Sequence, residues 1–118
     1  MVDLFAGISV RDFAGALAWY EKLLGSPPAF LPNDVEAVWE LAEHRFLFIV
    51  EDAEGAGRAT HTIFLDDLDA RVADIASRGI EPDEQEEYPG KARKAIYRDA
   101  DGNEIGFGGA IQDEPSYE

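Results

Sequence analysis

The sequence contains two copies of one short pattern, and this internal repeat constrains the fold more than any other feature. In each copy a β-branched strand runs into an aspartate, an amphipathic helical stretch follows, and a glycine ends it. The first copy spans residues 7–25 and the second spans residues 62–79, with the aspartates at Asp12 and Asp67. Such self-similarity predicts two copies of one supersecondary element that pack against each other.

The spacing of apolar residues predicts the order βαβββ in both copies. Asp12 is a good N-cap for a helix over Phe13–Leu24, which Gly25 ends, and the second helix is expected over Leu68–Arg78. The predicted strands are Leu4–Val10, Ala29–Pro32, Val35–Leu41, Arg45–Val50, Thr60–Asp66, Ile80–Glu87, Lys94–Arg98 and Asn103–Gly108.

These elements predict an α+β fold in which two tandem βαβββ modules form a curved mixed sheet with helices on the convex face and a concave cleft. At 118 residues the chain is expected to form one domain over residues 1–110, with modules at about 4–51 and 60–109. Residues 111–118 are acidic and poor in apolar side chains, so we expect a frayed tail.

Strand alternation then divides the side chains between the two faces of the sheet. We expect Ile8, Val10, Phe46, Phe48 and Val50 to pack against the helices in the first module, with Ile63, Leu65, Ile105 and Phe107 in the second. The other set would line the concave side, where it includes Phe5, Leu47, Ile49, Thr60, Phe64, Glu104 and Gly106.

Charge and cysteine content exclude several classes of function. A net charge of −15 repels nucleic acid and anionic membranes, and it serves either solubility or the attraction of a cationic ligand. The absence of cysteine rules out disulfides, thiolate zinc sites and a cysteine nucleophile, and it fits a cytoplasmic protein. No apolar run is long enough to span a membrane, and the N-terminus does not read as a signal peptide.

Three segments carry a resemblance to a known family. They are Val10–Gly25, with Trp19-Tyr20 ahead of Leu24-Gly25, then Asp67–Ala70, and Arg98–Ile105, which contains Asp99-Ala100-Asp101-Gly102-Asn103. In this order the chain resembles the vicinal oxygen chelate superfamily, which includes glyoxalase I, extradiol dioxygenases and the fosfomycin and bleomycin resistance proteins. The resemblance covers about residues 4–110, and its departures are Trp19 for Phe and Ala100 for Pro.

The resemblance implies where a metal would be held in metal-using relatives. The first-strand ligand lies seven residues before the aspartate, which gives Phe5 and Thr60, and the last-strand ligand lies four residues after Gly102, which gives Gly106 with Leu47 as its partner. Phenylalanine, leucine and glycine offer no side-chain donor, and a threonine hydroxyl is a poor ligand. We therefore expect no metal site and no cofactor.

Three residues keep alternative roles at this level. His61 is either a structural residue at a strand end or a ligand contact, and Glu104 is either a solvated rim residue or a general base. Trp39 is either part of the core or a wall on which a ligand stacks. His44 is expected in a hairpin turn.

Among the relatives the chain is most similar to the metal-free bleomycin-resistance type, which are homodimers that bind a cationic drug between subunits. This resemblance implies a homodimeric protein that sequesters a cationic or amphipathic toxic compound, bound by Phe5, Trp39, Leu47, Ile49, Thr60, Phe64, Glu104 and Gly106. The alternative is a lyase, isomerase or dioxygenase with a relocated metal site or a carboxylate base. A third possibility is a subunit that serves assembly only.

Overall fold

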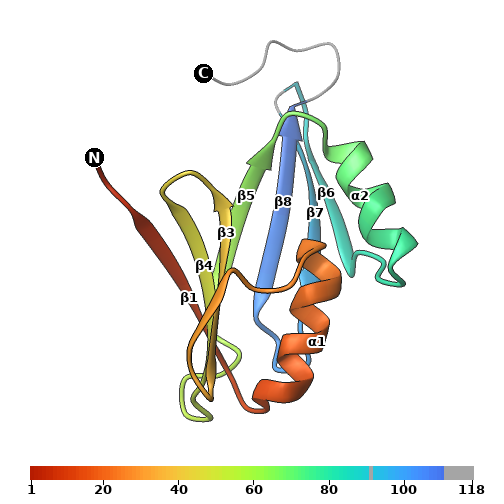
Figure 1. The fold of residues 1–118 in the computed structure, drawn as a ribbon. Helices are drawn as coiled ribbons and strands as arrows, with labels where there is room; N and C mark the ends of the chain where they lie inside the picture. Colours follow the sequence, from red (N-terminus) through yellow and green to blue (C-terminus); the bar gives the residue numbers. More distant parts are fainter. Residues whose placement is uncertain (91, 111–118) are drawn as a thin grey trace.

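The computed structural model describes residues 1–90 and 92–110 and contains the same element order twice (Figure 1). The first module consists of β1 (Leu4–Val10), α1 (Phe13–Leu24), β2 (Phe30–Asn33), β3 (Glu36–Ala42) and β4 (Arg45–Glu51). The second consists of β5 (Thr60–Leu65), α2 (Leu68–Ser77), β6 (Glu84–Tyr88), β7 (Ala92–Arg98) and β8 (Glu104–Ala110). The predicted βαβββ order is confirmed, whereas the tail predicted over residues 111–118 lies outside the described residues.

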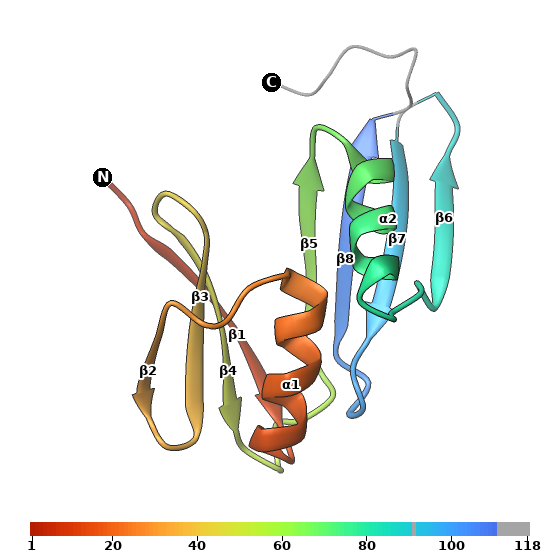
Figure 2. The same ribbon diagram turned by 45° about the vertical axis from the view of Figure 1, so that its right-hand side comes forward.

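Each module forms a four-stranded mixed sheet, with strand order β1-β4-β3-β2 in the first and β5-β8-β7-β6 in the second. The pairs β1–β4 and β5–β8 are parallel, and the other neighbours are antiparallel. Both helices lie on the same side of the two sheets (Figure 2). One contiguous core joins the modules, which confirms the α+β class. Neither helix is both long and apolar enough to cross a bilayer.

The two helices begin at the aspartates of the repeat. The Asp12 carboxylate accepts a hydrogen bond from the Gly15 amide at 3.3 Å, and Asp67 accepts one from the Ala70 amide at 3.0 Å. These bonds satisfy amide groups that have no partner within a first helical turn. Gly25 ends α1 with φ at 83°, in the left-handed region that glycine adopts without a steric penalty.

Strand β6 begins at Glu84 and not at Ile80 as predicted. Ile80 instead packs against the hydrophobic core, and Pro82 has no amide hydrogen to donate to a ladder. The first backbone bond to β7 is donated by Asp83 to Ile96, at 2.8 Å.

Strand β4 carries its side chains on faces opposite to those predicted. Leu47 and Ile49 are buried in the core, whereas Phe46, Phe48 and Val50 lie on the other face and are half-buried. Pairing decides this orientation, because Ile49 lies beside Ile8 on β1 and partners in register point to the same face. The predicted concave positions of Leu47 and Ile49 are therefore wrong.

Trp39 also belongs to the core, which resolves the alternative left open by the sequence. Its side chain is 2% exposed and pairs with Leu47 in the β3–β4 register. The indole Nε1 donates to the Ser26 carbonyl oxygen at 2.9 Å, so the one polar atom of the ring has a partner. A ligand on the uncovered face of the sheet does not reach this ring.

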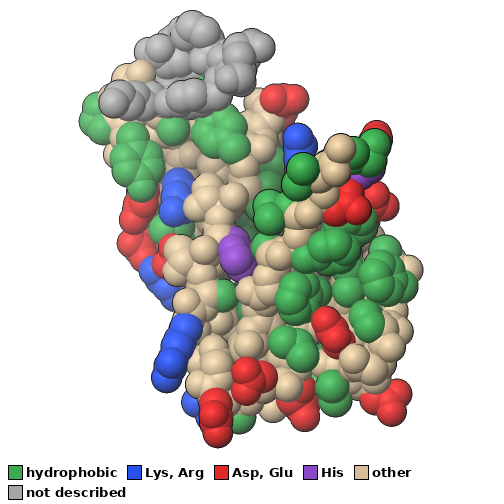
Figure 3. Space-filling view, turned by 90° about the vertical axis from the view of Figure 1, so that its left-hand side faces the viewer, with side chains coloured by type: hydrophobic (Ala, Val, Ile, Leu, Met, Phe, Trp, Pro, Cys, Tyr) green, Lys and Arg blue, Asp and Glu red, His purple; other side chains and the backbone are tan. Residues whose placement is uncertain are grey.

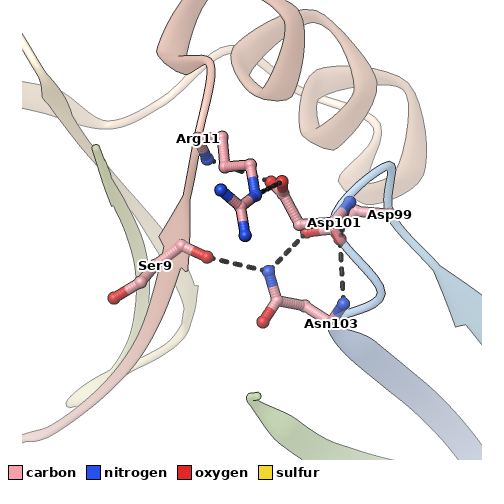
Figure 4. A network of polar contacts seen from close by, with 5 residues as sticks. All are labelled: Ser9, Arg11, Asp99, Asp101 and Asn103. Atoms are coloured by element: carbon pink, nitrogen blue, oxygen red, sulfur yellow. Dashed lines mark hydrogen bonds and ion pairs between the residues drawn. The ribbon is translucent and has the colours of Figure 1, made fainter. Parts of the chain in front are cut away.

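A buried polar network ties the two modules together at the turn between β7 and β8 (Figure 4). The Asn103 side chain, which is fully buried, donates to the Ser9 carbonyl and to the Asp99 carboxylate, both at 2.9 Å. Its amide oxygen accepts from the Ala59 amide at 3.0 Å. Arg11 contacts Asp101 through both its amide and its guanidinium. The Asp-Ala-Asp-Gly-Asn segment of the second module thus forms hydrogen bonds and an ion pair with the first module.

Helix α1 adds a further bond to this network. The Tyr20 hydroxyl donates to Asp99 Oδ2, the oxygen that also accepts from the Asn103 side chain, at 2.8 Å, in a site with no solvent exposure at the tyrosine. Burial, followed by the neighbouring Asp99 charge, raises the pKa of Tyr20 well above its ordinary value. The tyrosine therefore stays a neutral donor throughout the physiological range.

Candidate functional site

The face of the two sheets that the helices leave uncovered is here called the open face. Figure 3 views the molecule from the side opposite the helices, and hydrophobic side chains gather over the right half of this view, on the first module. Because partners in register share a face, the open face of the first module carries Phe5, Gly7, Ser9, Phe46, Phe48, Val50, Glu36, Val38, Glu40 and Phe30.

Three phenylalanines of β1 and β4 form an aromatic patch, defined as Phe5, Phe46 and Phe48. The rings of Phe5 and Phe46 stack with centroids 4.5 Å apart and an interplanar angle of 9°. Phe48 lies over Gly7, where an added Cβ would come within 2.5 Å of its ring. Phe5 remains 49% exposed, so the patch offers a large aromatic surface to a second molecule.

The open face of the second module contains two glycines of β8, Gly106 and Gly108, which are here called the glycine floor. Gly106 and Gly108 of β8 separate β5 from β7, with Phe64 and Lys94 flanking Gly108 in one row of the register. An added Cβ at Gly108 would lie 3.1 Å from the Phe64 ring, and one at Gly106 would overlap Lys94 Cε. The space that the two missing side chains leave is thus occupied by Phe64 and Lys94.

Most of the charged groups near this floor are bound to one another or to a polar side chain. The Arg98 guanidinium contacts Glu84 at 2.6 Å and Glu104 at 3.2 Å, and the Glu84 hydrogen bond is the largest cause of its raised pKa. Tyr88 donates to Glu86 at 2.6 Å, which raises the pKa of the tyrosine. Glu104 is therefore a half-buried member of an ion pair, and not a free carboxylate base.

A groove of about 410 Å³ runs between the edges of β1 and β5. β1 and β5 are edge strands of their sheets, so each pairs with a neighbouring strand on one side only. Its lining is mainly apolar and consists of Leu4, Ala6, Leu41, Ala42, Arg45, Phe46, Leu47, His61, Thr62, Ile63, Phe64 and Leu65. The groove is lined by Phe46 of the aromatic patch and by Phe64 of the second module. Pockets that bind small molecules have this mixture of apolar walls and few polar groups.

His61 lies in this groove but holds the modules together. Its Nε2 lies 3.0 Å from the Gly7 carbonyl oxygen, and it is half-buried on the core side with Ile63 and Leu65. The ring nitrogen that meets a carbonyl must carry the proton, so it is a donor there. His44 occupies the β3–β4 turn as predicted, with φ at 66° and Nδ1 2.6 Å from Asp3.

The strand register identifies the residues of this chain that occupy the positions of metal ligands in metal-using relatives. Gly106 pairs with Thr62 just as Phe48 pairs with Gly7, and these two partners each lie five residues before a helix-capping aspartate. The first-module counterpart of Gly106 is therefore Phe48, and its assignment to Leu47 is wrong. The four positions are Phe5, Phe48, Thr60 and Gly106, and together they offer a single hydroxyl oxygen. This set does not fit a divalent ion.

The structure brings together only some of the residues predicted to bind a ligand. Leu47 and Phe64 line the groove, Phe5 lies in the aromatic patch, and Gly106 lies in the glycine floor. Thr60 and Glu104 pair at the far end of the open face, while Trp39 and Ile49 are enclosed in the core. Across the described residues no three histidine, aspartate or glutamate side chains are close enough to hold a metal ion.

Sequence reasoning missed two features of the open face. Phe46 and Phe48 were assigned to the core because every residue from Phe46 to Val50 is apolar, so alternation alone could not tell the two faces apart. The second feature is Lys94, which pairs with Gly108 in the β7–β8 register. The signal available for it was a lysine in one predicted strand and a cluster of glycines in the next.

No protein-family model and no curated protein sequence matches the chain. Among solved structures it is similar to a glyoxalase/bleomycin resistance protein from Catenulispora acidiphila, with 49% identity, a TM-score of 0.91, and coverage of 94% of this chain and 100% of that one. A bleomycin-binding protein in complex with bleomycin has 19% identity, a TM-score of 0.72, and coverage of 94% and 100%. A lactoylglutathione lyase from Agrobacterium tumefaciens has 19% identity, a TM-score of 0.69, and coverage of 90% and 91%. The chain belongs to the glyoxalase/bleomycin resistance protein family of the vicinal oxygen chelate superfamily.

Proposed function

We propose that this protein is a metal-free binder of amphipathic small molecules that contain an aromatic ring, and that it sequesters a toxic compound of this kind. The observation that carries the proposal is the aromatic patch, which lies uncovered beside an apolar groove. A flat aromatic ligand gains by stacking on Phe5 and by leaving water at the same time.

Binding is favoured over catalysis by the chemistry of the groups on the open face. The four positions that correspond to metal ligands supply one hydroxyl among them, and Glu104 is engaged with Arg98. The fold alone does not decide, since its neighbours include both a bleomycin-binding protein and a lyase. Metal analysis of the purified protein tests this part of the proposal, because stoichiometric zinc, nickel, manganese or iron would favour an enzyme.

The charge of the ligand follows from two opposing features. The net charge of −15 raises the concentration of cationic compounds near the protein. On the open face itself, however, Glu84 and Glu104 share the single guanidinium of Arg98, and Glu86 accepts a hydrogen bond from the Tyr88 hydroxyl. These carboxylates are therefore already engaged, so the open face selects an amphipathic ligand through its apolar surface, while the net charge acts on the ligand only at long range.

A homodimer is part of the proposal. Phe5, Phe30 and Leu31 are each about half exposed, and a monomer that leaves so many large apolar side chains in water is unusual. A second copy over the open face would enclose the ligand between subunits. Light scattering should give twice the chain mass of 13.0 kDa. The lack of cysteine supports a cytoplasmic location.

The fluorescent aromatic amine phenylnaphthylamine is a suitable neutral probe for the site. We expect saturable binding that weakens about tenfold in Phe48→Ala, since a stacked ring contributes about 1 kcal/mol beyond its buried area. Val35→Ala serves as the matched control, because Val35 is also an exposed apolar residue but follows β2 in a turn. Equal affinity in both variants, or no binding by the wild type, would contradict the proposed site.

A further inference from the structure

We propose that Lys94 is the polar anchor of the open face and that the ligand carries an acidic group, such as a carboxylate, sulfonate or phosphate, next to its aromatic part. The inference rests on the proposed function for the location of the site. It adds the chemical class of the group that binds there.

The position of Lys94 within the sheet is the first observation. The side chain leaves β7 in the row of Gly108 and Phe64 and crosses onto β8, where its stem lies against the Gly106 backbone. Its Nζ lies 3.4 Å from the place a Gly106 Cβ would occupy. The lysine side chain thus lies over the glycine floor, and the residue is half-buried.

The lack of a counter-ion is the second observation. Strand β7 carries three basic residues, of which Arg93 contacts Asp69 at 2.9 Å and Arg98 contacts two glutamates. Lys94 forms no ion pair or hydrogen bond with any residue in the described part of the chain. Its cross-strand partner Glu86 is bound to the Tyr88 hydroxyl instead. In a chain with 25 acidic residues and 10 basic ones, a half-buried lysine that has no direct ion pair among residues 1–90 and 92–110 is unexpected.

These two observations define what would bind. Because Gly106 has no side chain, the lysine stem lies directly over its backbone, and we expect an acidic group to approach Nζ from the solvent side of the open face. A charge-assisted hydrogen bond to a partly desolvated ammonium is about twice as strong as a neutral one. The Thr62 hydroxyl lies in the Gly106 row and offers a second donor. The exposed Phe64 ring and Phe46 of the aromatic patch line the groove and would hold the apolar part of the same molecule.

Two dyes that share one aromatic frame test the inference. Anilinonaphthalene sulfonate carries an acidic group, and phenylnaphthylamine lacks it. We expect the wild type to prefer the sulfonate, and Lys94→Met to weaken sulfonate binding about tenfold while it changes the affinity for the neutral dye less than about twofold. Methionine keeps an unbranched apolar stem over Gly106 and removes only the charge. Lys22→Met, at the exposed end of α1, is the matched control and should leave both affinities unchanged.

The outcomes separate this inference from the proposed function. If Lys94→Met leaves sulfonate binding unchanged, or weakens both dyes equally, the lysine acts only through the packing of its stem and the inference is overturned. If the wild type binds neither dye, the proposed function fails and the inference fails with it. Should Lys94→Met lose its fold by circular dichroism, Lys94→Arg decides the question, since it must retain the preference for the sulfonate.

Discussion

Replacement of Asn103 by alanine is expected to destabilise the protein by about 3–5 kcal/mol. The variant loses three hydrogen bonds, to Ser9, Asp99 and Ala59, each worth about 1 kcal/mol. It also leaves the Ser9 carbonyl and the Ala59 amide without these partners, at a further cost of about 1 kcal/mol or more for each group that water cannot reach. Because all three bonds leave a side chain that is fully buried, solvent compensates for little of this loss.

Urea unfolding followed by far-ultraviolet circular dichroism measures this difference. A chain of 118 residues has a total stability of about 6–18 kcal/mol, so Asn103→Ala would remove a large part of it. Asn103→Asp keeps an acceptor for Ala59 but places a second carboxyl group against Asp99 in a buried site, so it should cost at least as much as alanine near neutral pH. Gln85→Ala, exposed on the edge strand β6, is the control and should change stability by less than about 0.5 kcal/mol.

The reasoning fails if Asn103→Ala costs less than about 1 kcal/mol. Such a result would mean that the shared apolar core and the other contacts between the modules, such as His61 with Gly7, join them without help from Asn103. A cost as large as expected, with unchanged binding of phenylnaphthylamine to the folded fraction, would place Asn103 in the framework and outside the ligand site.

Three further predictions follow from the same contacts. Gly57→Ala should lower the free energy of unfolding more than Gly79→Ala. Both glycines have a positive φ, but only a Cβ at Gly57 would overlap a backbone atom, the Asp101 carbonyl oxygen. Urea unfolding should show a loss of about 1–2 kcal/mol for Gly79→Ala, and equal losses in the two variants would refute the overlap. The raised pKa of Tyr20 means that the unfolded chain loses the hydroxyl proton at a lower pH than the folded chain does. The free energy of unfolding should therefore fall above about pH 10 by up to ~1.4 kcal/mol per pH unit. Tyr20→Phe should flatten this slope, and an unchanged slope would contradict the assignment to Tyr20. Trp39→Phe should lower stability by about 1–3 kcal/mol yet leave dye affinity unchanged, and weakened binding would return Trp39 to the site.

The sequence predicted those parts of the fold that local chemistry determines. Asp12 and Asp67 begin the helices, Gly25 ends the first one, and Gly102 adopts the positive φ of 95° that the β7–β8 turn requires. These features depend on one residue and its immediate neighbours, so a single sequence is enough to identify them.

The faces of β3 and β4 depended instead on pairing between distant residues. Strand β4 is apolar on both sides, and the β3–β4 register shifts between Glu40 and Ala42 next to the left-handed His44. No alternation or turn motif fixes such a register. This is why Phe48 was assigned to the core and Leu47 to the open face.

The role of the Asp-Ala-Asp-Gly-Asn segment was also beyond reach from the sequence. As a turn it needs only Asp99 and Gly102, and Asn103 is the residue that reaches across to Ser9. Since the partner is a backbone carbonyl, no complementary side chain in the first module signals the contact.

The position of this network gives the molecule one fastened end and one free end. Ala59, Ser9 and Asn103 meet where β5 begins and β1 finishes, whereas Leu4 and Leu65 border the groove at the opposite tips of the same strands. The contact between His61 Nε2 and the Gly7 carbonyl oxygen joins the two strands between these ends, so the groove widens only if this contact breaks. We therefore expect backbone amide protons to exchange faster at the groove ends of β1 and β5 than beside Asn103.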